Sequence, residues 1–507
     1  MLILKTVKKF ACIFLIICML ITANLFVMSS CAKDSSGNTD NNNATSAGNT
    51  AADNNGNTTG TTSRWDREPL SLPQKDFGGQ EFNVITGQVT DAHRMYDKFS
   101  ADDQTGEPIN DALYKRKLYI EDTYNIKLTT TENAAPATAA KKSILAGDNT
   151  YALIVDTIGN TVSLASQSLL TDFYTVPYIK DDLDKPWWDQ ALKRDLSING
   201  KLYFEAGDIV LRDKLRSSCT YFNKDMCKSV GVDYPYKYVN DGTWTIDKLL
   251  EITKGVNKDL NGDGVMDQND QWGFMSQYEF GLHLFEASGE KTVSLDQNNT
   301  PVITINTDRA LNVIQKVLTV CADPNNMFMA DKIKGAADIW IQASAYFEEN
   351  RFLMRASLLE PVVRDLRAMT TDFGILPTPK FDGSQQNYFT YAEMSGLVVS
   401  IPNTADPEFS GLITEALAYD SGSTLMPAFY DLCLTSKVLR DDESEGMLDI
   451  IFNNKVYDIG YIYNIGTLPT ILNTLVQSGK TDFVSAYDKA QGAVEKALQK
   501  FIDSYNK

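Results

Sequence analysis

The composition of the chain changes abruptly at residue 65, and this change decides which part can form a hydrophobic core. Residues 32–64 consist almost entirely of Asn, Thr, Ser, Gly, Ala and Asp, with no aromatic residue before Trp65. Such a segment cannot bury enough apolar surface to offset its loss of conformational entropy, so we expect disorder there. As a flexible coil its ends lie about 30 Å apart. The remainder, residues 65–507, is longer than one core usually supports, which predicts two lobes.

The first thirty residues have the pattern of an export signal. Three lysines precede an apolar run at residues 10–28, and a Ser-Ser pair leads directly into Cys31. Small residues before a cysteine resemble a lipobox, in which Cys31 is acylated and becomes the first mature residue. The alternative is an uncleaved membrane helix, because the run is almost long enough to span a bilayer. The polar segment after Cys31 favours a lipid anchor and a tether.

The folding region is strongly acidic. The formal net charge is −19 with the three signal lysines counted, so the mature chain would carry −22. An acidic protein repels phosphate backbones, which argues against nucleic acid as a partner. Four cysteines remain after Cys31, too few and too scattered for a disulfide framework; they could be buried thiols or form one or two bridges: Cys219, Cys227, Cys321 and Cys433.

Strands and helices alternate at the start of the folding region. Residues 81–86 and 125–130 predict strands, and the nearly all-apolar run at 151–156 predicts a buried parallel strand. Helices are predicted between them at 108–124 and 137–146. This alternation indicates an α/β lobe. A second set of elements follows, with a helix at 245–256, strands at 373–376 and 396–401, and helices through Leu417 and at 490–505.

One loop has the spacing of a calcium site. Its oxygen-bearing side chains stand at loop positions 1, 3, 5, 9 and 12, with glycine at position 6 and a carbonyl at position 7. Aspartate replaces the usual glutamate at position 12. Because Ca²⁺ takes six to eight oxygen ligands around a tight turn, the loop predicts a single structural Ca²⁺ site; a solvated polar turn is the alternative. The predicted ligands are Asp259, Asn261, Asp263, Val265, Asp267 and Asp270.

Two adjacent indoles beside a carboxylate suggest sugar binding. Residues 186–189 read Pro-Trp-Trp-Asp, and sugars bind on aromatic faces bordered by polar side chains. The alternative for Trp187 and Trp188 is core packing, since large aromatic residues usually lie inside. For the later tryptophans we expect packing: Trp244, Trp272 and Trp340.

Patterns for catalysis are scarce. His93 and His283 are the only histidines, which leaves little material for zinc sites or Ser-His triads. The chain contains neither a Gly-x-Ser-x-Gly elbow nor a phosphate-binding glycine loop. A glycosidase carboxylate pair stays open, although abundant carboxylates are expected of any acidic exported protein.

Several stretches together resemble the family 1 extracellular solute-binding proteins, the sugar-capturing lipoproteins of ABC importers in Gram-positive bacteria. The stretches lie in order along the whole folding region: 105–112, 185–189, 199–203, 221–224, 241–247, 374–380 and 440–449. The resemblance implies a two-lobed "type II" periplasmic-binding-protein-like α/β fold, with a groove between the lobes. It implies crossings near residues 205–215 and 391–400. One lobe would hold 65–207 plus about 395–445, and the other 208–394 plus about 446–507.

The resemblance also implies where a ligand would bind, at strand ends and crossings. The expected ligand-binding residues are Asp156, Asn160, Trp187, Trp188, Asp208, Tyr391 and Glu393. The implied protein is a monomeric, lipid-anchored binder on the outer face of the cell membrane, not an enzyme. It would capture a carbohydrate and deliver it to ABC permease subunits. A lipid-anchored glycosidase or esterase and a carbohydrate sensor without a permease remain the alternatives.

Overall fold

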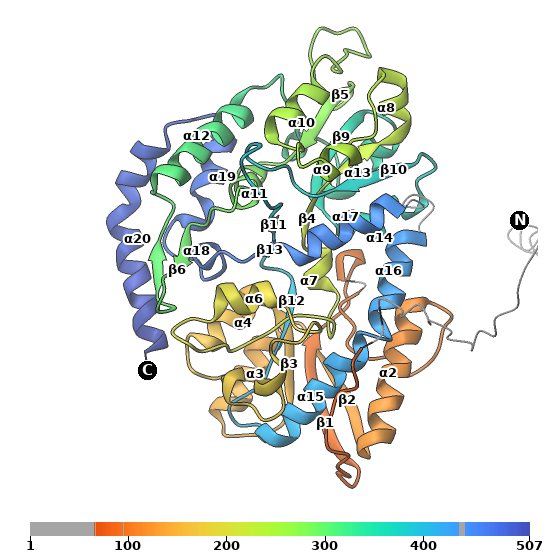
Figure 1. Ribbon diagram of the computed structural model, residues 1–507, viewed down its shortest axis with the longest axis vertical. Helices are drawn as coiled ribbons and strands as arrows, with labels where there is room; N and C mark the ends of the chain where they lie inside the picture. Colours follow the sequence, from red (N-terminus) through yellow and green to blue (C-terminus); the bar gives the residue numbers. More distant parts are fainter. Residues whose placement is uncertain (1–64, 66, 95, 436–441, 507) are drawn as a thin grey trace, which may run out of the picture. The chain divides into compact units, whose positions relative to one another are not determined.

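Figure 1 shows the computed structural model, which describes residues 65, 67–94, 96–435 and 442–506. The signal-like run, Cys31 and the polar segment lie outside the described residues, so the anchor and the tether stay predictions. The described residues belong to one compact unit, Thr62–Lys507. Among them, none of the helices combines the length and the apolar character needed to cross a bilayer.

The first sheet contains four of the predicted strands and has the order β12-β3-β1-β2. β1 runs parallel to β2 and to β3, and β12 runs antiparallel to β3. The helix α3 packs against β1, β2 and β3, and α4 packs against β3 and β12. These elements are β1 (Gln80–Gly87), β2 (Ile126–Asn133), β3 (Leu153–Thr157), β12 (Leu397–Ser400), α2 (Pro108–Tyr124), α3 (Pro136–Leu145) and α4 (Ile158–Ala165).

The boundaries of α2 follow from its terminal residues. Pro108 occupies the first turn, where its missing N–H costs nothing. The Glu107 carboxylate accepts a hydrogen bond from the Asn110 N–H at 2.7 Å and caps the helix. The helix ends where Asn125 adopts a left-handed φ of 46°. The predicted helix at 108–124 is therefore confirmed.

The second sheet has the order β10-β4-β9-β5-β8. β5 is parallel to β8 and β9, whereas β4 is antiparallel to both β9 and β10. Only β10 among these strands was predicted from the sequence. The bounds are β4 (Ser218–Asn223), β5 (Trp272–Ser276), β8 (Phe328–Met329), β9 (Phe352–Leu358) and β10 (Phe373–Leu376).

Further helices and strands complete the unit. They are η1 (Ala92–Arg94), η2 (Phe173–Thr175), α5 (Ile179–Asp182), α6 (Gln190–Leu196), α7 (Arg212–Leu215), α8 (Lys224–Val230), α9 (Tyr236–Asn240), α10 (Ile246–Thr253), α11 (Phe280–Ala287), β6 (Val293–Leu295), β7 (Pro301–Ile303), α12 (Asp308–Ala322), η3 (Ala330–Lys332), α13 (Ile339–Glu348), α14 (Glu360–Arg364), η4 (Leu366–Ala368), β11 (Thr390–Tyr391), α15 (Pro407–Ser421), α16 (Leu425–Thr435), α17 (Asp442–Asn453), β13 (Lys455–Val456), α18 (Ile459–Ile462), α19 (Leu468–Ser478) and α20 (Phe483–Tyr505). The Thr245 hydroxyl caps α10 by accepting from the Lys248 N–H, and the helix ends at Thr253, before the predicted end at residue 256.

The chain passes between the two sheets more than once. Glu205 pairs with Val399 at the first sheet, and β4 begins the second sheet at Ser218. The chain returns after β11, because Leu397 already belongs to β12. A further passage leads from α15, which packs on α2, through α16 to α17, which packs on β10. The first two passages lie where the resemblance implied crossings, whereas the third was not among the implied crossings; the lobe boundaries themselves stay a prediction.

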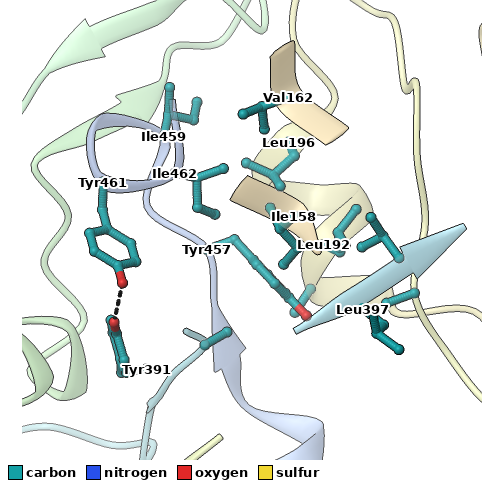
Figure 2. Close-up of a cluster of buried hydrophobic side chains, with 14 of the residues drawn as sticks. Ile158, Val162, Leu192, Leu196, Tyr391, Leu397, Tyr457, Ile459, Tyr461 and Ile462 are labelled. Atoms are coloured by element: carbon teal, nitrogen blue, oxygen red, sulfur yellow. Dashed lines mark hydrogen bonds between the residues drawn. The ribbon is translucent and has the colours of Figure 1, made fainter. Parts of the chain in front are cut away.

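Buried side chains form two hydrophobic clusters. Figure 2 shows part of the larger cluster, where α18 packs its isoleucines toward α4 and α6. The four cysteines left open by the sequence are all free and buried. Burial raises the pKa of Cys321 to about 12, so this thiol stays protonated and acts as a packing group.

Candidate functional site

Polar side chains from both sheets converge on one cavity of about 210 Å³. In open α/β sheets, ligands bind outside the carboxyl ends of the parallel strands, because the loops there are free to carry functional groups. The cavity lies at these ends of both sheets and is called the cleft below. Its lining residues are His93, Arg216, Gln277, Glu279, Trp340, Arg355, Ser357, Leu358, Glu360, Pro361, Arg364, Glu393 and Ser395.

The first sheet supplies three of the polar groups. His93 follows β1, and its Nε2 lies 2.9 Å from Asp338 Oδ2. Glu393 and Ser395 precede β12, whose first residue pairs with the last residue of β3. The Ser395 hydroxyl donates to the Glu393 carboxylate, and the Glu393 N–H donates to the Arg216 carbonyl at 3.0 Å. These bonds hold Glu393 at the passage between the sheets.

The second sheet supplies most of the remaining groups through its strand ends. Gln277 and Glu279 follow β5, and Ser357 and Glu360 lie at the end of β9. Arg216 comes just before β4, which runs the opposite way. Antiparallel β4 therefore begins at the same edge where β5 and β9 end, and this topology brings the five side chains together.

The arginines of the cleft are already engaged with protein groups. Arg216 Nη1 lies 3.2 Å from Glu360 Oε2 and 3.6 Å from Glu393 Oε2. Arg364 binds Asp365 through two parallel hydrogen bonds of 2.6 Å, a bidentate pair. Arg355 donates to the Ser344 hydroxyl at 2.8 Å. Because carboxylates offset the cations, the described lining favours a neutral polar ligand over an anion.

Trp340 is the aromatic ring of the cleft. It lies in the first turn of α13, which Asp338 caps by accepting from the Trp340 and Ile341 N–H groups. The ring is partly buried against the second hydrophobic cluster and also lines the cleft. An anchored indole with one open side is a suitable platform for the C–H face of a sugar. Packing was the expectation for Trp340, so its place in the cleft was not predicted.

Glu279 has the most perturbed carboxyl group on this wall. Burial, followed by the negative charge of Glu393, raises its pKa to about 7, and a hydrogen bond from Tyr391 opposes the shift. The Tyr391 hydroxyl lies 3.3 Å from Glu279 Oε1 and 2.6 Å from the Tyr461 hydroxyl. Figure 2 shows the two tyrosines pointing toward one another from β11 and α18.

A second, larger cavity of about 400 Å³ is lined in part by α7, and we call it the rear cavity. Asp213 and Lys214 of α7 line it, as do Trp188 and Lys455. Lys455 Nζ lies 2.9 Å from Asp213 Oδ2 and also contacts Asp189. Burial alone would raise the pKa of Asp189, but Lys455 outweighs it and holds that pKa below the ordinary value. The charges here are paired internally, which makes a ligand unnecessary.

The predicted tryptophan pair lies inside the protein and outside the cleft. Trp187 and Trp188 are 3% and 2% exposed, and their indole N–H groups both donate to Glu415, at 2.6 and 3.0 Å. The buried Glu415 side chain offers one oxygen to each indole, so both indole N–H groups have a hydrogen-bond partner. This pairing explains why two adjacent indoles can be buried together. Of the two indoles, Trp188 lines the rear cavity, and neither lines the cleft.

The other predicted ligand residues are divided among three places. Asp156 is buried; it accepts from the Ala137 N–H at 2.9 Å and from Asn160 Nδ2 at 3.0 Å, so the pair braces the start of α3. Asp208 lines the rear cavity, 3.2 Å from Arg67. Tyr391 lies directly behind Glu279, and Glu393 lines the cleft. The structure thus brings Tyr391 and Glu393 together and leaves the other five candidates apart from the cleft.

The calcium-like loop folds into tight turns. Asp259 accepts from the Gly262 and Gly264 N–H groups at 2.7 and 2.9 Å, and these bonds hold its pKa below the ordinary value. Both glycines have left-handed φ, 74° and 77°. Asp270 is buried and accepts from the Leu260 N–H at 3.0 Å. Among the described residues, no three His, Cys, Asp or Glu side chains group closely enough to hold a metal ion by themselves. Ca²⁺ here would therefore need Asn261 and a backbone carbonyl as well.

Solved structures share this fold, whereas no family model and no curated sequence matches the chain. A cyclo/maltodextrin-binding protein in complex with maltotetraose has a TM-score of 0.52 at 15% identity, covering 86% of this chain and 98% of that one. An ABC substrate-binding protein from Listeria monocytogenes in complex with cycloalternan has a TM-score of 0.50 at 14% identity (84% and 98% covered). A sugar transporter from Rhizobium etli in an open conformation has a TM-score of 0.51 at 12% identity (84% and 99% covered). The chain has the periplasmic-binding-protein-like α/β fold.

Proposed function

We propose that this protein is the extracellular solute-binding component of an ABC importer and that it captures an oligosaccharide in the cleft. The observation that carries the proposal is the convergence of strand ends from both sheets on one polar cavity with an indole on its wall. The solved structures of the same fold include proteins bound to maltotetraose and cycloalternan. Internally compensated charges in the cleft also suit a neutral, hydroxyl-rich ligand.

Capture would work by closure of the two sheets' loops on the ligand. A sugar that touches Trp340 on one side and Glu393 on the other favours the closed state, since it has fewer partners in the open one. The passages between the sheets would act as the hinge, where few residues absorb the rotation. A permease in the membrane would then recognise the closed state. Acylation of Cys31 would hold the protein, as a monomer, on the outer face of the membrane beside that permease.

Calorimetric titration with a panel of sugars tests the capture proposal. The panel contains maltose, maltotriose, maltotetraose and cycloalternan, with sodium glucuronate as an anionic comparison. We expect a neutral oligosaccharide to bind at one site per chain, with a parallel change in tryptophan fluorescence that is lost in Trp340→Phe. Failure of every neutral sugar to bind would contradict the proposal, and preference for glucuronate would contradict the neutral ligand class.

A second candidate function is a lipid-anchored glycosidase. The observation behind it is that Glu279 and Glu393 both line the cleft, and glycosidases use two carboxyl groups with separated pKa values. Incubation of each bound sugar with the protein, followed by chromatography of the products, separates the two functions. We expect the sugar to be recovered intact. Hydrolysis that stops in Glu279→Gln would establish the glycosidase.

We further propose that the loop at residues 259–270 binds one structural Ca²⁺. The support is the ligand spacing together with the left-handed glycines and the buried Asp270, which fix a tight turn. Binding to the folded state raises the free energy of unfolding by RT ln(1 + [L]/Kd). We therefore expect the melting temperature to fall when a chelator removes Ca²⁺, with sugar affinity unchanged.

The control for Ca²⁺ is the variant Asp263→Ala. It should melt at the same temperature with or without chelator, near the value of the chelated parent. Elemental analysis of the purified protein provides a second measurement. An unchanged melt together with the absence of calcium in the sample would overturn the site.

A further inference from the structure

The helix α11 carries three titratable side chains on one face, and the first of them opens into the cleft. Glu279 stands at the N-terminal end of α11, and His283 and Glu286 follow at the fourth and seventh positions after it, which share a helix face. His283 and Glu286 are each 1% exposed. The row runs from the ligand cavity into the core.

The two inner groups of this row are neutral. Burial lowers the pKa of His283 to about 3 and raises that of Glu286 well above its ordinary value. Among the described residues, His283 Nε2 and both Glu286 carboxyl oxygens lack a hydrogen-bond partner. The His283 ring stacks on Tyr391 with the ring centroids 4.2 Å apart. The back of the Glu279 site is therefore a stack of rings that provides no positive charge.

Hydroxyl groups around Glu279 can serve either of its protonation states. A tyrosine hydroxyl donates one hydrogen bond and accepts others. When Glu279 is ionised, Tyr391 can turn its proton toward Oε1; when Glu279 is protonated, Tyr391 can donate to Tyr461 and accept from the carboxyl group. The distances of 3.3 Å and 2.6 Å allow both arrangements. The site can thus gain or lose a proton without leaving a buried group unpaired.

The charged groups around Glu279 are carboxylates or arginines with other partners. Glu393 faces it from the passage after β11 and Asp331 from η3, and both raise the Glu279 pKa. Across the cleft, Arg216 pairs with Glu360 and Glu393. The other nitrogen-bearing side chains of the wall also contact protein groups: Arg355 binds Ser344, Arg364 binds Asp365, and His93 contacts Asp338. No ion pair joins Glu279 to a cation in the described part of the chain.

We propose that Glu279 is a ligand-contacting residue that couples sugar capture to proton uptake. A neutral sugar displaces water from the cleft and brings no cation, so the ionised carboxylate loses solvation while Glu393 remains beside it. The protonated form can instead donate a hydrogen bond to a ring or hydroxyl oxygen of the sugar. Ligand binding therefore favours protonated Glu279. This inference rests on the proposed function.

The sign of the pH dependence follows from linkage. In the free protein the pKa of Glu279 is about 7, and the loss of solvation proposed above would raise it further in the complex. Binding takes up a proton between these two values, so affinity is greatest below pH 7 and falls as the pH rises through 7. One proton limits the fall to about tenfold per pH unit.

Titration calorimetry with maltotetraose, in buffers of different ionisation enthalpy at pH 6, 7 and 8, measures the protons exchanged. We expect uptake of a fraction of one proton at pH 7 and weaker binding at pH 8. Glu279→Gln should abolish the exchange and flatten the pH dependence. Glu286→Gln is the matched control on the same helix face; it should retain both effects because Glu286 is protonated throughout.

The outcomes separate this inference from the capture proposal. Binding without proton exchange, release of protons, or exchange that persists in Glu279→Gln would overturn the role of Glu279 and leave capture intact. Failure of wild-type protein to bind maltotetraose or any other neutral sugar of the panel would overturn both.

Discussion

The cleft and the rear cavity differ in size, and the larger of the two is the less suited to a ligand. The rear cavity has about 400 Å³ and the cleft about 210 Å³. In the rear cavity, Lys455 lies between Asp189 and Asp213, so its charges are satisfied by one another. In the cleft, polar groups from the strand ends of both sheets meet, and Trp340 lies at the wall. The ligand site is thus marked by convergent strand ends and an aromatic ring, and cavity volume alone is a poor guide.

The largest expected effect concerns stability at the rear cavity. Lys455→Met removes the cation between two buried carboxylates, and breaking such a pair costs about 3–5 kcal/mol of unfolding free energy. Urea denaturation measures this loss. The control Lys248→Met, on the exposed pair with Glu251, should leave the midpoint nearly unchanged. A small loss in Lys455→Met would show that this cavity is not a stabilising network.

Gly207 also lines the rear cavity, and a substitution there tests how closely the backbone is packed. Its φ is 146°, and an added Cβ would lie 2.1 Å from the Trp187 carbonyl oxygen. Gly207→Ala should lower the unfolding free energy by about 1–3 kcal/mol. Gly200→Ala is the control, since its φ of 72° is also positive but the space around it is open. Equal losses in the two variants would mean that backbone strain alone, and not the close approach, decides the cost.

In the cleft the expected effect is on binding. Trp340→Ala should weaken affinity for the best sugar of the panel roughly 10- to 100-fold, about 1.4–2.8 kcal/mol, because the stacking face is lost. Trp340→Phe keeps a ring and should recover most of the affinity. Titration calorimetry measures both. If Lys455→Met lowered sugar affinity more than Trp340→Ala does, the assignment of the two cavities would be reversed.

The smallest effect concerns the pair of Arg67 and Asp208 at the edge of the rear cavity. Burial raises the pKa of Asp208 to about 6, and Arg67 opposes that shift. Asp208 is therefore ionised at pH 8 and largely protonated at pH 5. Arg67→Ala should lower the unfolding free energy by about 1 kcal/mol at pH 8, where the carboxylate loses its partner, and by less at pH 5. A larger loss at pH 5 would contradict this pairing.

Much of the first sheet was predictable from the sequence. The strands at 80–87 and 153–157 have clear apolar patterns, and α2 has recognisable caps at both ends. Of the second sheet, only β10 was predicted. β9 carries Arg355 in a buried run, and β5 is a short strand directly after the polar loop, so neither has a plain strand pattern. Because β5 and β9 were not predicted, the residues at their ends were not considered as ligand-binding candidates: Gln277, Glu279 and Ser357.

The candidate site was predicted less well because local sequence does not report the distant partner of a side chain. The two indoles at 187–188 suggested a sugar platform, but Glu415, more than two hundred residues away, accepts hydrogen bonds from both inside the core. Trp340 was expected to pack in the core because large aromatic residues usually lie inside. Glu393 was found through its position at a crossing, which the family resemblance implied.

Hydrogen exchange with and without maltotetraose tests the central claim most directly. If the sugar is captured in the cleft, the amides of residues 277–280 and 393–396 should gain protection, since they lie at the ends of β5 and β12. The amides of residues 449–455, beside the rear cavity, should exchange as before. Protection confined to residues 449–455, with none at 277–280 or 393–396, would contradict the account.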